Sequence, residues 1–311
     1  MSMPAAGPLC VVYVEYGGAE RKVVLPLIAD VLRAVPGQAR YLVVVDNAGV
    51  PADLEPPIGF DGAQTIAGSN VHREFSGWQE GVEAARRAWG IDGMTLVLAN
   101  DTIARNHNFS GPRKYYFRHA FERAGSDATA AVIGEIDGVP YTMETASGEI
   151  GLYVSTYLLL LTSGALDAAL PLTVDVDRID TLLHADWQNS NGTLFRDGMP
   201  VEYRKFLERW LHVAAGGWYR AEALTQDNFG FFRGKAMSIM LEQSLSARVL
   251  AGGGRLVSIW KGDGRFNGIS RVLETYERKW RVPARATKWV YRPIVRSLQF
   301  LFRSGARRDV H

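Results

Sequence analysis

Cysteine is nearly absent from this sequence, because the 311 residues include only Cys10. One cysteine can build neither a disulfide framework nor a cysteine-based metal cluster, and Cys10 lies in an apolar run that is typical of the protein core. The 6 histidines show no H-x-x-x-H spacing, so the sequence does not predict a zinc site. This composition is compatible with a reducing compartment.

Long apolar runs are also missing. The longest ones, such as 157–161, fall far below the roughly 20 residues that a membrane-spanning helix needs. The N-terminal segment lacks the basic start and apolar middle of a signal peptide. With 47% hydrophobic and 22% charged residues, the chain has the composition of a folded globular protein. We therefore expect a cytoplasmic protein that is either soluble or bound to a membrane surface.

Three familiar motifs of nucleotide-binding proteins and hydrolases are absent. No G-x-G-x-x-G follows the first predicted strand, where positions 17 and 18 supply only a paired glycine. The sequence contains neither a P-loop nor a G-x-S-x-G nucleophile elbow. These absences argue against a dinucleotide-binding Rossmann domain, a P-loop nucleotide hydrolase and an α/β-hydrolase.

What the sequence does contain is an alternation of strand and helix patterns. Strands are predicted at 9–16, 41–45, 64–67, 95–99, 130–136 and 152–162, and helices at 21–35, 75–89 and 237–250. From 9–16 to 95–99 the predicted elements follow in the order β-α-β-β-α-β. This order predicts an α/β domain with a mostly parallel sheet flanked by helices. We expect this domain to span residues 1–266.

Polar residues follow two of the buried strands at the point where each strand ends. The run at 95–99 stops at Asn100, Asp101 and Thr102, and the run at 41–45 stops at Asp46 and Asn47. In open α/β sheets, ligands bind at the carboxyl ends of the strands. A carboxylate fixed there can hold Mg²⁺ or Mn²⁺ against phosphate oxygens, because these cations prefer oxygen ligands. The alternative is that these residues only form turns or cap helices.

The order of several motifs resembles that of the inverting GT-A glycosyltransferases, in particular the bacterial glycan-building ones of family 2 and the rhamnan-synthesis type. The motifs are Glu-Tyr16-Gly17 after the first strand, Val-Val-Asp46-Asn47-Ala after the second, Asn70 before Phe-Ser-Gly-Trp at 75–78, and Leu-Ala-Asn100-Asp101-Thr102. Downstream, 153–159 resembles the strand on the acceptor side, and the segment around Glu242 resembles the acidic helix that ends the catalytic domain. The resemblance covers about residues 9–260 and implies a GT-A-like, Rossmann-like fold.

One position departs from the family pattern. Many members carry Asp-x-Asp at the metal strand, whereas this chain has Ala99, Asn100 and Asp101, so the first carboxylate is missing. The resemblance then implies a divalent cation, Mg²⁺ or Mn²⁺, held by Asp101, the donor diphosphate and water. Weak or absent metal dependence is the alternative.

The resemblance also implies a mechanism, in which an acceptor hydroxyl displaces a nucleotide diphosphate at the anomeric carbon of a sugar. Glu242 is our candidate base, with Asp227 in reserve. A solvated helix position for Glu242 and a turn position for Asp227 are the alternatives. The implied donor contacts come from Tyr16, Gly17, Asp46, Asn47, Arg73, Asn100, Asp101 and Thr102. We expect Trp187, Trp218 and Tyr219 to stack on acceptor sugars.

The C-terminal extension, residues 267–311, differs from the body in charge. From position 271 onward it carries 11 Lys and Arg against 3 Asp and Glu. Basic residues at 285, 288, 292, 296 and 303 fall opposite an apolar stripe on a helical wheel, which predicts a basic amphipathic helix. We expect it to bind an anionic membrane surface, such as the inner face of the cytoplasmic membrane. Packing of this helix on the body is the alternative.

The sequence therefore favours an enzyme that moves a sugar from a nucleotide-diphosphate donor to a saccharide or lipid-linked acceptor, in the synthesis of a bacterial surface polysaccharide. A non-catalytic subunit that binds nucleotide sugar or glycan is the competing hypothesis, because the first carboxylate is missing. A nucleotide-dependent methyltransferase is a third hypothesis, because Asp46 could also hold a ribose. We expect no nucleic-acid partner, since the body is net negative and carries no recognised reading motif.

Overall fold

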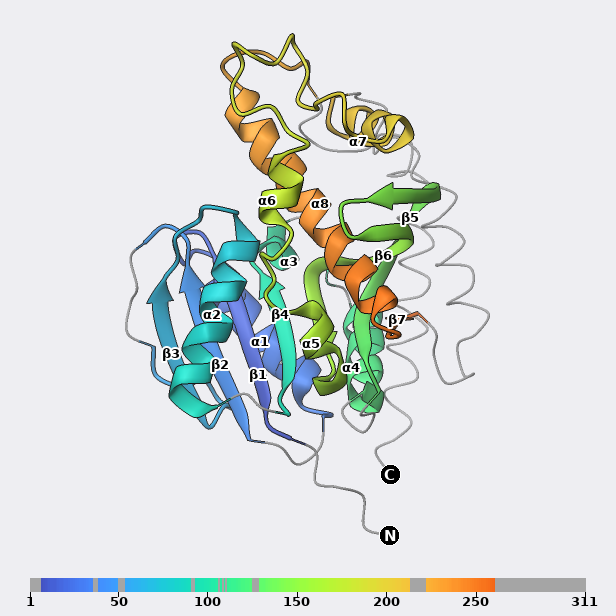
Figure 1. Ribbon diagram of the computed structural model, residues 1–311. Coiled ribbons are helices and arrows are strands. Elements are labelled where there is room, and N and C mark those ends of the chain that lie inside the picture. The colour runs from blue at the N-terminus through green and yellow to red at the C-terminus, as the bar shows by residue number, and fades with distance from the viewer. Residues whose placement is uncertain are drawn as a thin grey trace, which may run out of the picture.

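The computed structural model describes residues 7–35, 39–49, 54–90, 93–105, 107, 109, 111–124, 129–212 and 222–260. Within these ranges, one sheet of seven strands forms the centre of the molecule, in the order β3-β2-β1-β4-β6-β5-β7 (Figure 1). The strands are β1 (Leu9–Glu15), β2 (Arg40–Asp46), β3 (Gly62–Ala67), β4 (Thr95–Asn100), β5 (Ala131–Thr145), β6 (Gly148–Leu161) and β7 (Arg255–Ser258).

The sheet is mostly parallel, as the sequence predicts. Strand β1 pairs in parallel with β2 and β4, β2 pairs in parallel with β3, and β5 pairs in parallel with β7. Strand β6 runs antiparallel to both of its neighbours, β4 and β5. The carboxyl ends of β1, β2 and β4 consequently meet at one edge of the sheet, where the polar residues were expected.

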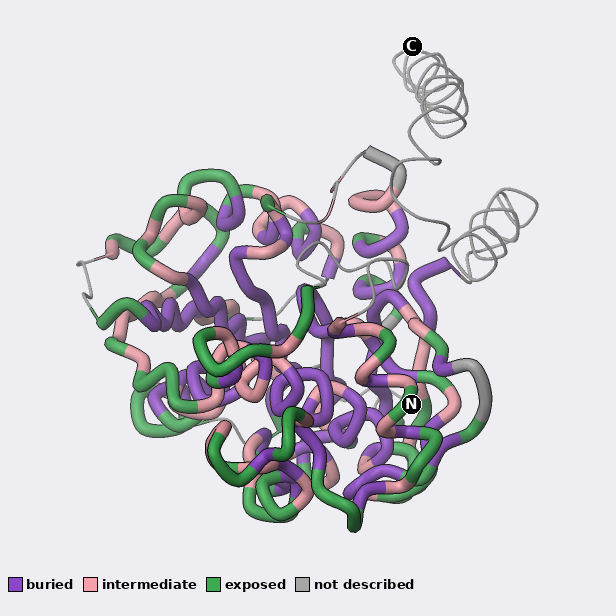
Figure 2. Tube along the Cα trace, turned by 90° about the horizontal axis from the view of Figure 1, so that it is seen from above, coloured by how far each residue is buried: buried purple, intermediate pink, exposed green. Residues whose placement is uncertain are grey.

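Helices cover both faces of this sheet, which makes the fold Rossmann-like. The described helices are α1 (Arg21–Leu32), α2 (Glu74–Trp89), α3 (Thr102–Arg105), α4 (Gly111–Ala124), α5 (Leu166–Ala169), α6 (Val176–Asp180), α7 (Val201–His212) and α8 (Phe229–Ala251). Helices α1 and α4 lie behind the sheet in Figure 1, and α2 and α8 lie in front. Each layer has its own apolar core against the sheet. Buried segments run through the middle of the molecule and exposed ones surround them (Figure 2).

Strand β1 shows why the apolar runs form this sheet. All seven of its residues are buried. Val12 packs in the layer of α2, and Val11 packs in the layer of α1. A strand that is covered on both faces needs apolar residues at every position, which explains the unbroken apolar run in the sequence.

Helix α2 lies close to the sheet because small residues face it. A Cβ atom at Gly81 would stand 2.3 Å from Cγ1 of Val12, so a larger residue there would push the helix away. Trp78, one turn earlier, is fully buried, and its ring nitrogen donates a hydrogen bond of 2.8 Å to the backbone oxygen of Ala99. This packing fixes the start of α2 near the carboxyl end of β4.

Two helices of the structure differ from the predicted elements for reasons that the sequence explains. Helix α8 begins at Phe229, eight residues before the predicted start, because Gly230 and Gly234 weaken the helical signal there. Helix α4 was not predicted because it is rich in charged residues, although Tyr116, Phe117, Ala120 and Phe121 form a buried stripe along it.

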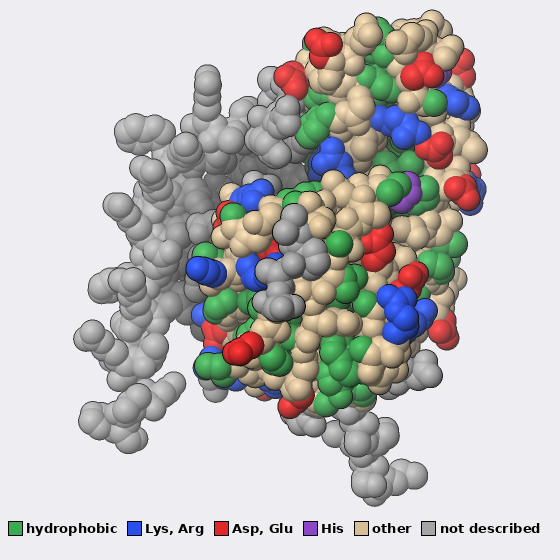
Figure 3. Space-filling model, turned by 90° about the vertical axis from the view of Figure 1, so that its left-hand side faces the viewer, with side chains coloured by type: hydrophobic (Ala, Val, Ile, Leu, Met, Phe, Trp, Pro, Cys, Tyr) green, Lys and Arg blue, Asp and Glu red, His purple; other side chains and the backbone are tan. Residues whose placement is uncertain are grey.

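The surface carries charges of both signs. On the face that includes the β3 edge, Lys and Arg side chains alternate with Asp and Glu among apolar and other polar groups (Figure 3). In the described part of the chain, no helix is both long and apolar enough to cross a membrane. The predicted basic extension, 267–311, and the predicted domain boundary at 266 lie outside the described residues.

Candidate active site

A cleft of about 820 Å³ opens at the carboxyl ends of β1 and β4 and continues along β6 and α8. Six of the predicted site residues line it: Tyr16, Arg73, Asn100, Asp101, Thr102 and Glu242. These residues come from four different segments that are up to 226 positions apart in the sequence, yet the fold brings them to one cavity. The motif order in the sequence thus corresponds to a real juxtaposition in space.

Asp101 lies at the point where β4 passes into α3. Its backbone N–H donates to the oxygen of Val14 on β1 at 3.1 Å, which holds it against the sheet. Its side chain is buried, and Oδ2 lies 3.3 Å from Nη2 of Arg105 but accepts no hydrogen bond from the described residues. Burial raises the pKa of Asp101, and the positive charge of Arg105 opposes that rise. Asp101 therefore presents a carboxylate oxygen that still lacks a hydrogen-bonding partner.

Asn100 and Thr102 flank Asp101 and shape the turn. The backbone N–H of Thr102 donates to Oδ1 of Asn100 at 3.1 Å, and the Thr102 hydroxyl donates to the same oxygen. This local pattern supports the start of α3 without using the Asp101 side chain.

Glu242 reaches the cleft from the middle of α8. Its Oε1 accepts a hydrogen bond of 2.7 Å from the backbone N–H of Thr156 and one of 3.0 Å from the Thr156 hydroxyl. Burial raises the pKa of Glu242 to about 7, although these hydrogen bonds and the nearby charge of Lys235 act in the opposite direction. A carboxylate with this pKa accepts a proton readily near neutral pH, as a general base requires.

Asp137 on β5 is a cleft residue that the sequence analysis missed. It accepts a hydrogen bond of 2.7 Å from the hydroxyl of Ser155, and its negative charge helps raise the pKa of Glu242. Ser155 and Thr156 are consecutive on β6, so one dipeptide holds both carboxylates. The predicted end of β5 at 136 hid this relationship, because Asp137 then fell in a loop.

Arg73 links the two halves of the cleft. Its Nη2 donates to the backbone oxygen of Phe231 on α8 at 3.1 Å, and its guanidinium carbon lies 5.0 Å from the centre of the Phe231 ring. Its backbone has a positive φ of 54°, which is strained for a residue with a side chain. The side chain of Asn47 helps to hold this conformation by donating to the Arg73 oxygen at 3.0 Å.

Asp46 and Gly17 belong to the structure beneath the cleft rather than to the set of residues that lines it. Oδ1 of Asp46 accepts hydrogen bonds of 2.9 Å from the backbone N–H groups of both Gly17 and Ala48. Gly17 adopts a positive φ of 83°, which favours glycine. In the structure, Asp46 therefore fixes the loop that follows β1, and its predicted contact with a nucleotide base stays a prediction.

Several other predicted residues lie outside the cleft lining. Asp227 is exposed in the turn before α8. The ring of Trp187 meets the edge of Phe229, with the ring centres 6.1 Å apart. Trp218 and Tyr219 lie outside the described residues, so their acceptor role stays a prediction.

His107 and Glu74 are further cleft residues that the sequence analysis did not single out. The ring of His107 stacks on Tyr157 at 3.7 Å, and burial lowers its pKa to about 4, so it is neutral at pH 7. Glu74 accepts a hydrogen bond of 2.5 Å from the hydroxyl of Ser238 on α8. Both are single residues without a recognisable spacing, and only the fold places them at the cleft.

The cleft residues fit a hydrated divalent cation at Asp101. Oδ2 of Asp101 is buried without a hydrogen bond, which leaves a lone pair for a cation. The described residues contain no group of three or more His, Cys, Asp or Glu side chains that could enclose a metal. A cation at Asp101 would therefore keep several waters or bind phosphate oxygens, as Mg²⁺ commonly does.

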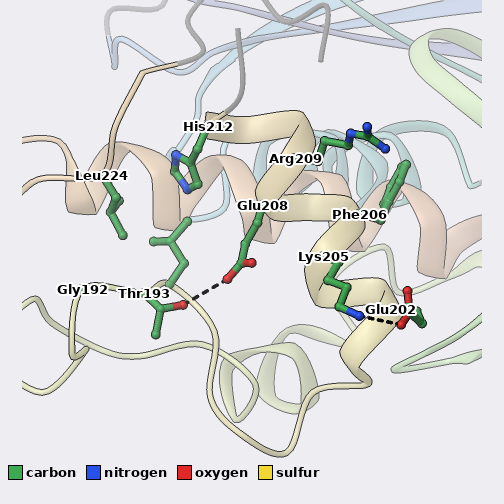
Figure 4. Close-up of a pocket in the computed structure, with 10 residues that line it drawn as sticks. Gly192, Thr193, Glu202, Lys205, Phe206, Glu208, Arg209, His212 and Leu224 are labelled. Atoms are coloured by element: carbon green, nitrogen blue, oxygen red, sulfur yellow. Dashed lines mark hydrogen bonds and ion pairs between the residues drawn. The ribbon is translucent and has the colours of Figure 1, made fainter. Parts of the chain in front are cut away.

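A second cavity of about 740 Å³ lies along α7 (Figure 4). Three of its charged groups are already partnered: Lys205 forms an ion pair with Glu202 at 2.8 Å, and Glu208 accepts from Arg204 at 2.9 Å. In Figure 4, the Glu208 carboxylate points toward Thr193, whose hydroxyl lies 3.4 Å away. The first cavity, with its partly unpartnered carboxylate, is the better candidate for chemistry.

Comparison with known proteins adds little to this geometry. No family model and no curated protein matches the sequence. Among solved structures, the chain is similar to one described as the crystal structure of 4-diphosphocytidyl-2C-methyl-D-erythritol synthase, with a TM-score of 0.33 and 14% identity. That match covers 74% of this chain and 99% of the other. Evidence for the function therefore comes from the residues of the cleft.

Proposed function

We propose that this chain is a glycosyltransferase that moves a sugar from a nucleotide-diphosphate donor to a saccharide or lipid-linked acceptor, with inversion at the anomeric carbon. The observation that carries this proposal is that Asp101 and Glu242 line one cavity from different walls of the fold. Asp101 lies at the carboxyl end of a parallel strand, where phosphate ligands bind in sheets of this kind. Glu242 has the pKa of a base that works near neutral pH.

In this proposal, Glu242 takes the proton of an acceptor hydroxyl as the hydroxyl oxygen attacks the anomeric carbon. The new bond to the acceptor oxygen forms on the face opposite the bond that breaks, so the configuration inverts. The electron pair of the broken bond leaves with the diphosphate. Arg73, Arg105 and Lys235 line the cleft and supply positive charge for that leaving group. A divalent cation bound at Asp101 would add further charge neutralisation.

The acceptor side of the cleft consists of β6 and the helices above it. Tyr153 and Tyr157 on β6 line this part but are buried, whereas Trp210 on α7 and Phe231 on α8 offer partly exposed rings. Aromatic faces of this kind stack on the apolar faces of sugar rings. We propose these rings for the stacking on acceptor sugars that the sequence analysis assigned to Trp187. The nature of the acceptor, including a role in surface polysaccharide synthesis, follows only from the sequence resemblance.

A second candidate function is a non-catalytic subunit that binds nucleotide sugar or glycan. One observation favours it: Ala99 is fully buried in the layer of α1 and α4, so position 99 offers no carboxylate to the cleft. The two candidates differ in turnover. A catalytic chain releases nucleoside diphosphate, whereas a binding subunit holds the donor unchanged.

The test is to incubate the protein with UDP-, GDP- and dTDP-sugars and saccharide acceptors in the presence of Mg²⁺, and to measure released nucleoside diphosphate and glycosylated product by mass spectrometry. We expect release and transfer with at least one donor, and both to be about 10²-fold or more slower in Glu242→Gln. Ser69→Ala, a change at an exposed loop residue outside the cleft, is the control. Binding of a donor without release would favour the non-catalytic subunit.

A further inference from the structure

Three carboxylates stand in a row at the end of the sheet where the cleft opens, all on one face of the sheet. Glu15 at the end of β1 is in register with Asp46 at the end of β2. On the other side, Val14 is in register with Asn100, so Asp101 follows beside Glu15. Adjacent strands lie about 4.8 Å apart, so these carboxylates are close neighbours. All three are at most 3% exposed.

The row carries more negative than positive charge. Arg21 forms an ion pair with Glu15, and Arg105 pairs with both Asp101 and Glu20. Counting Asp46, the group holds four acidic side chains and two arginines. Buried charge of one sign is costly unless a cation balances it.

Two carboxylate oxygens and one hydroxyl at this place lack hydrogen bonds within the described part of the chain: Oε2 of Glu15, Oδ2 of Asp101 and the hydroxyl of Tyr13. Tyr13 precedes Glu15 by two residues and is in register with Ala99, which precedes Asp101 by two, so the Tyr13 side chain lies on the same face of the sheet as both carboxylates. Tyr13 is fully buried, and a buried polar group without a partner is rare unless something binds it.

We propose that a divalent cation binds between the carboxylates of Glu15 and Asp101, next to the Tyr13 hydroxyl, and that Glu15 supplies the carboxylate that position 99 lacks. Position 99 is in register with Tyr13 and points into the apolar layer. Two residues further along the same two strands, Glu15 and Asp101 lie side by side on the same face of the sheet. These acidic side chains are therefore nearer the cleft than position 99 is. Two carboxylates plus water make a coordination shell that suits Mg²⁺ or Mn²⁺.

Arg105 competes with this cation. Its Nη2 lies 3.3 Å from Oδ2 of Asp101, and its Nε lies 3.3 Å from Oε1 of Glu20. When a cation binds Asp101, Arg105 keeps Glu20 as a partner and is free to turn its Nη2 toward the cleft. The role of the cation in holding a donor diphosphate rests on the proposed function, whereas its binding to Glu15 and Asp101 does not.

The test measures Mn²⁺ binding to the full chain, without nucleotide, by electron paramagnetic resonance. We expect wild type to bind one Mn²⁺, and Glu15→Gln and Asp101→Asn each to weaken binding by about 10- to 100-fold. Glu20→Gln removes the same charge from the same neighbourhood without removing a ligand, so it is the matched control and should bind within a few-fold of wild type. Arg105→Ala should bind Mn²⁺ more tightly, which a damaged fold would not do.

If Glu15→Gln fails to fold, Tyr13→Phe keeps the Glu15–Arg21 ion pair and should still weaken Mn²⁺ binding. Absence of Mn²⁺ binding in wild type, or equal binding in wild type and Glu15→Gln, overturns the proposal. The same samples are titrated with UDP, GDP and dTDP. Nucleotide binding without Mn²⁺ binding would overturn this site and leave the proposed function standing. Mn²⁺ binding without any nucleotide binding would support this site and overturn the proposed function.

Discussion

Thr156 donates two hydrogen bonds to a single carboxylate oxygen of Glu242, from its backbone N–H at 2.7 Å and from its hydroxyl at 3.0 Å. Both bonds favour the ionised carboxylate, while burial favours the protonated one. The balance leaves the pKa of Glu242 at about 7. The strand β6 therefore orients the candidate base and also tunes its pKa.

Glu242→Gln should lower kcat by about 10²- to 10⁴-fold, because glutamine keeps the shape of the side chain but cannot accept the acceptor proton. Nucleotide affinity should stay nearly unchanged. Steady-state kinetics with donor and acceptor varied separately measures both quantities. The matched comparison is Asp227→Asn, at the exposed reserve candidate. An active Glu242→Gln together with an inactive Asp227→Asn would move the base to Asp227.

Thr156→Val should shift the pH dependence of turnover toward higher pH. The variant keeps the backbone hydrogen bond but removes the hydroxyl that stabilises ionised Glu242, so the pKa of Glu242 rises above about 7. Since the base works in its ionised form, the rising limb of the kcat–pH profile moves with that pKa. Ser155→Ala, which removes the hydroxyl that bonds Asp137, is the neighbouring control. An unmoved profile in Thr156→Val would separate this limb from Glu242.

Glu242 should also make the fold less stable at high pH. Its pKa is about 7 in the folded protein, against an ordinary value of 4.5, so the folded state holds this proton more tightly than the unfolded state does. The contribution of Glu242 to the free energy of unfolding is therefore fully present below about pH 4.5 and lost as the pH rises through 7. Urea unfolding of wild type and Glu242→Gln should give similar stability at pH 4 and a more stable variant at pH 8. A wild type that is the more stable one at pH 8 would contradict the raised pKa.

Deleting residues 285–311 should release the protein from anionic vesicles while leaving activity on a soluble acceptor unchanged. The segment from 271 onward has 11 basic residues against 3 acidic ones, and the apolar stripe opposite them favours a membrane surface. Vesicle sedimentation at increasing salt measures this, because screening acts over about 8 Å at physiological ionic strength. Neutral vesicles are the control. Full-length protein that stays in solution with anionic vesicles at low salt would show that the extension serves another purpose.

The sequence predicted the parallel part of the sheet well because β1, β2 and β4 are buried on both faces. An unbroken apolar run leaves little choice of structure. The sequence predicted only the first part of β5, at 130–136, because Gly134, Gly138 and Pro140 resemble turn residues. In the structure the strand continues to Thr145 with register shifts after Gly134 and after Gly138, which absorb these residues. That extension carries Asp137 to the cleft.

The candidate site was predictable only in part, for a related reason. Asp101 and Glu242 stand out because each is an acidic residue next to a strong apolar pattern. Glu15 does not stand out, because a polar residue at the last position of a strand is usually taken to mark only where the strand ends. Its importance depends on register: only the pairing of β1 with β2 and β4 puts Glu15 between Asp46 and Asp101. The register between distant strands is set by the packing of the whole sheet, so it cannot be deduced from a single sequence.

In our proposal, one cleft binds a nucleotide diphosphate on the side of Asp101 and carries the base on the side of Glu242. Calorimetric titration of wild type, Asp101→Ala and Glu242→Gln with UDP, GDP and dTDP, in the presence of Mg²⁺, tests it most directly. We expect at least one nucleotide to bind wild type, to bind Glu242→Gln with nearly the same affinity, and to bind Asp101→Ala about tenfold or more weakly, a loss of about 1.4 kcal/mol. Binding that Asp101→Ala leaves intact, or a wild type that binds S-adenosylmethionine and none of the nucleotides, would contradict the account.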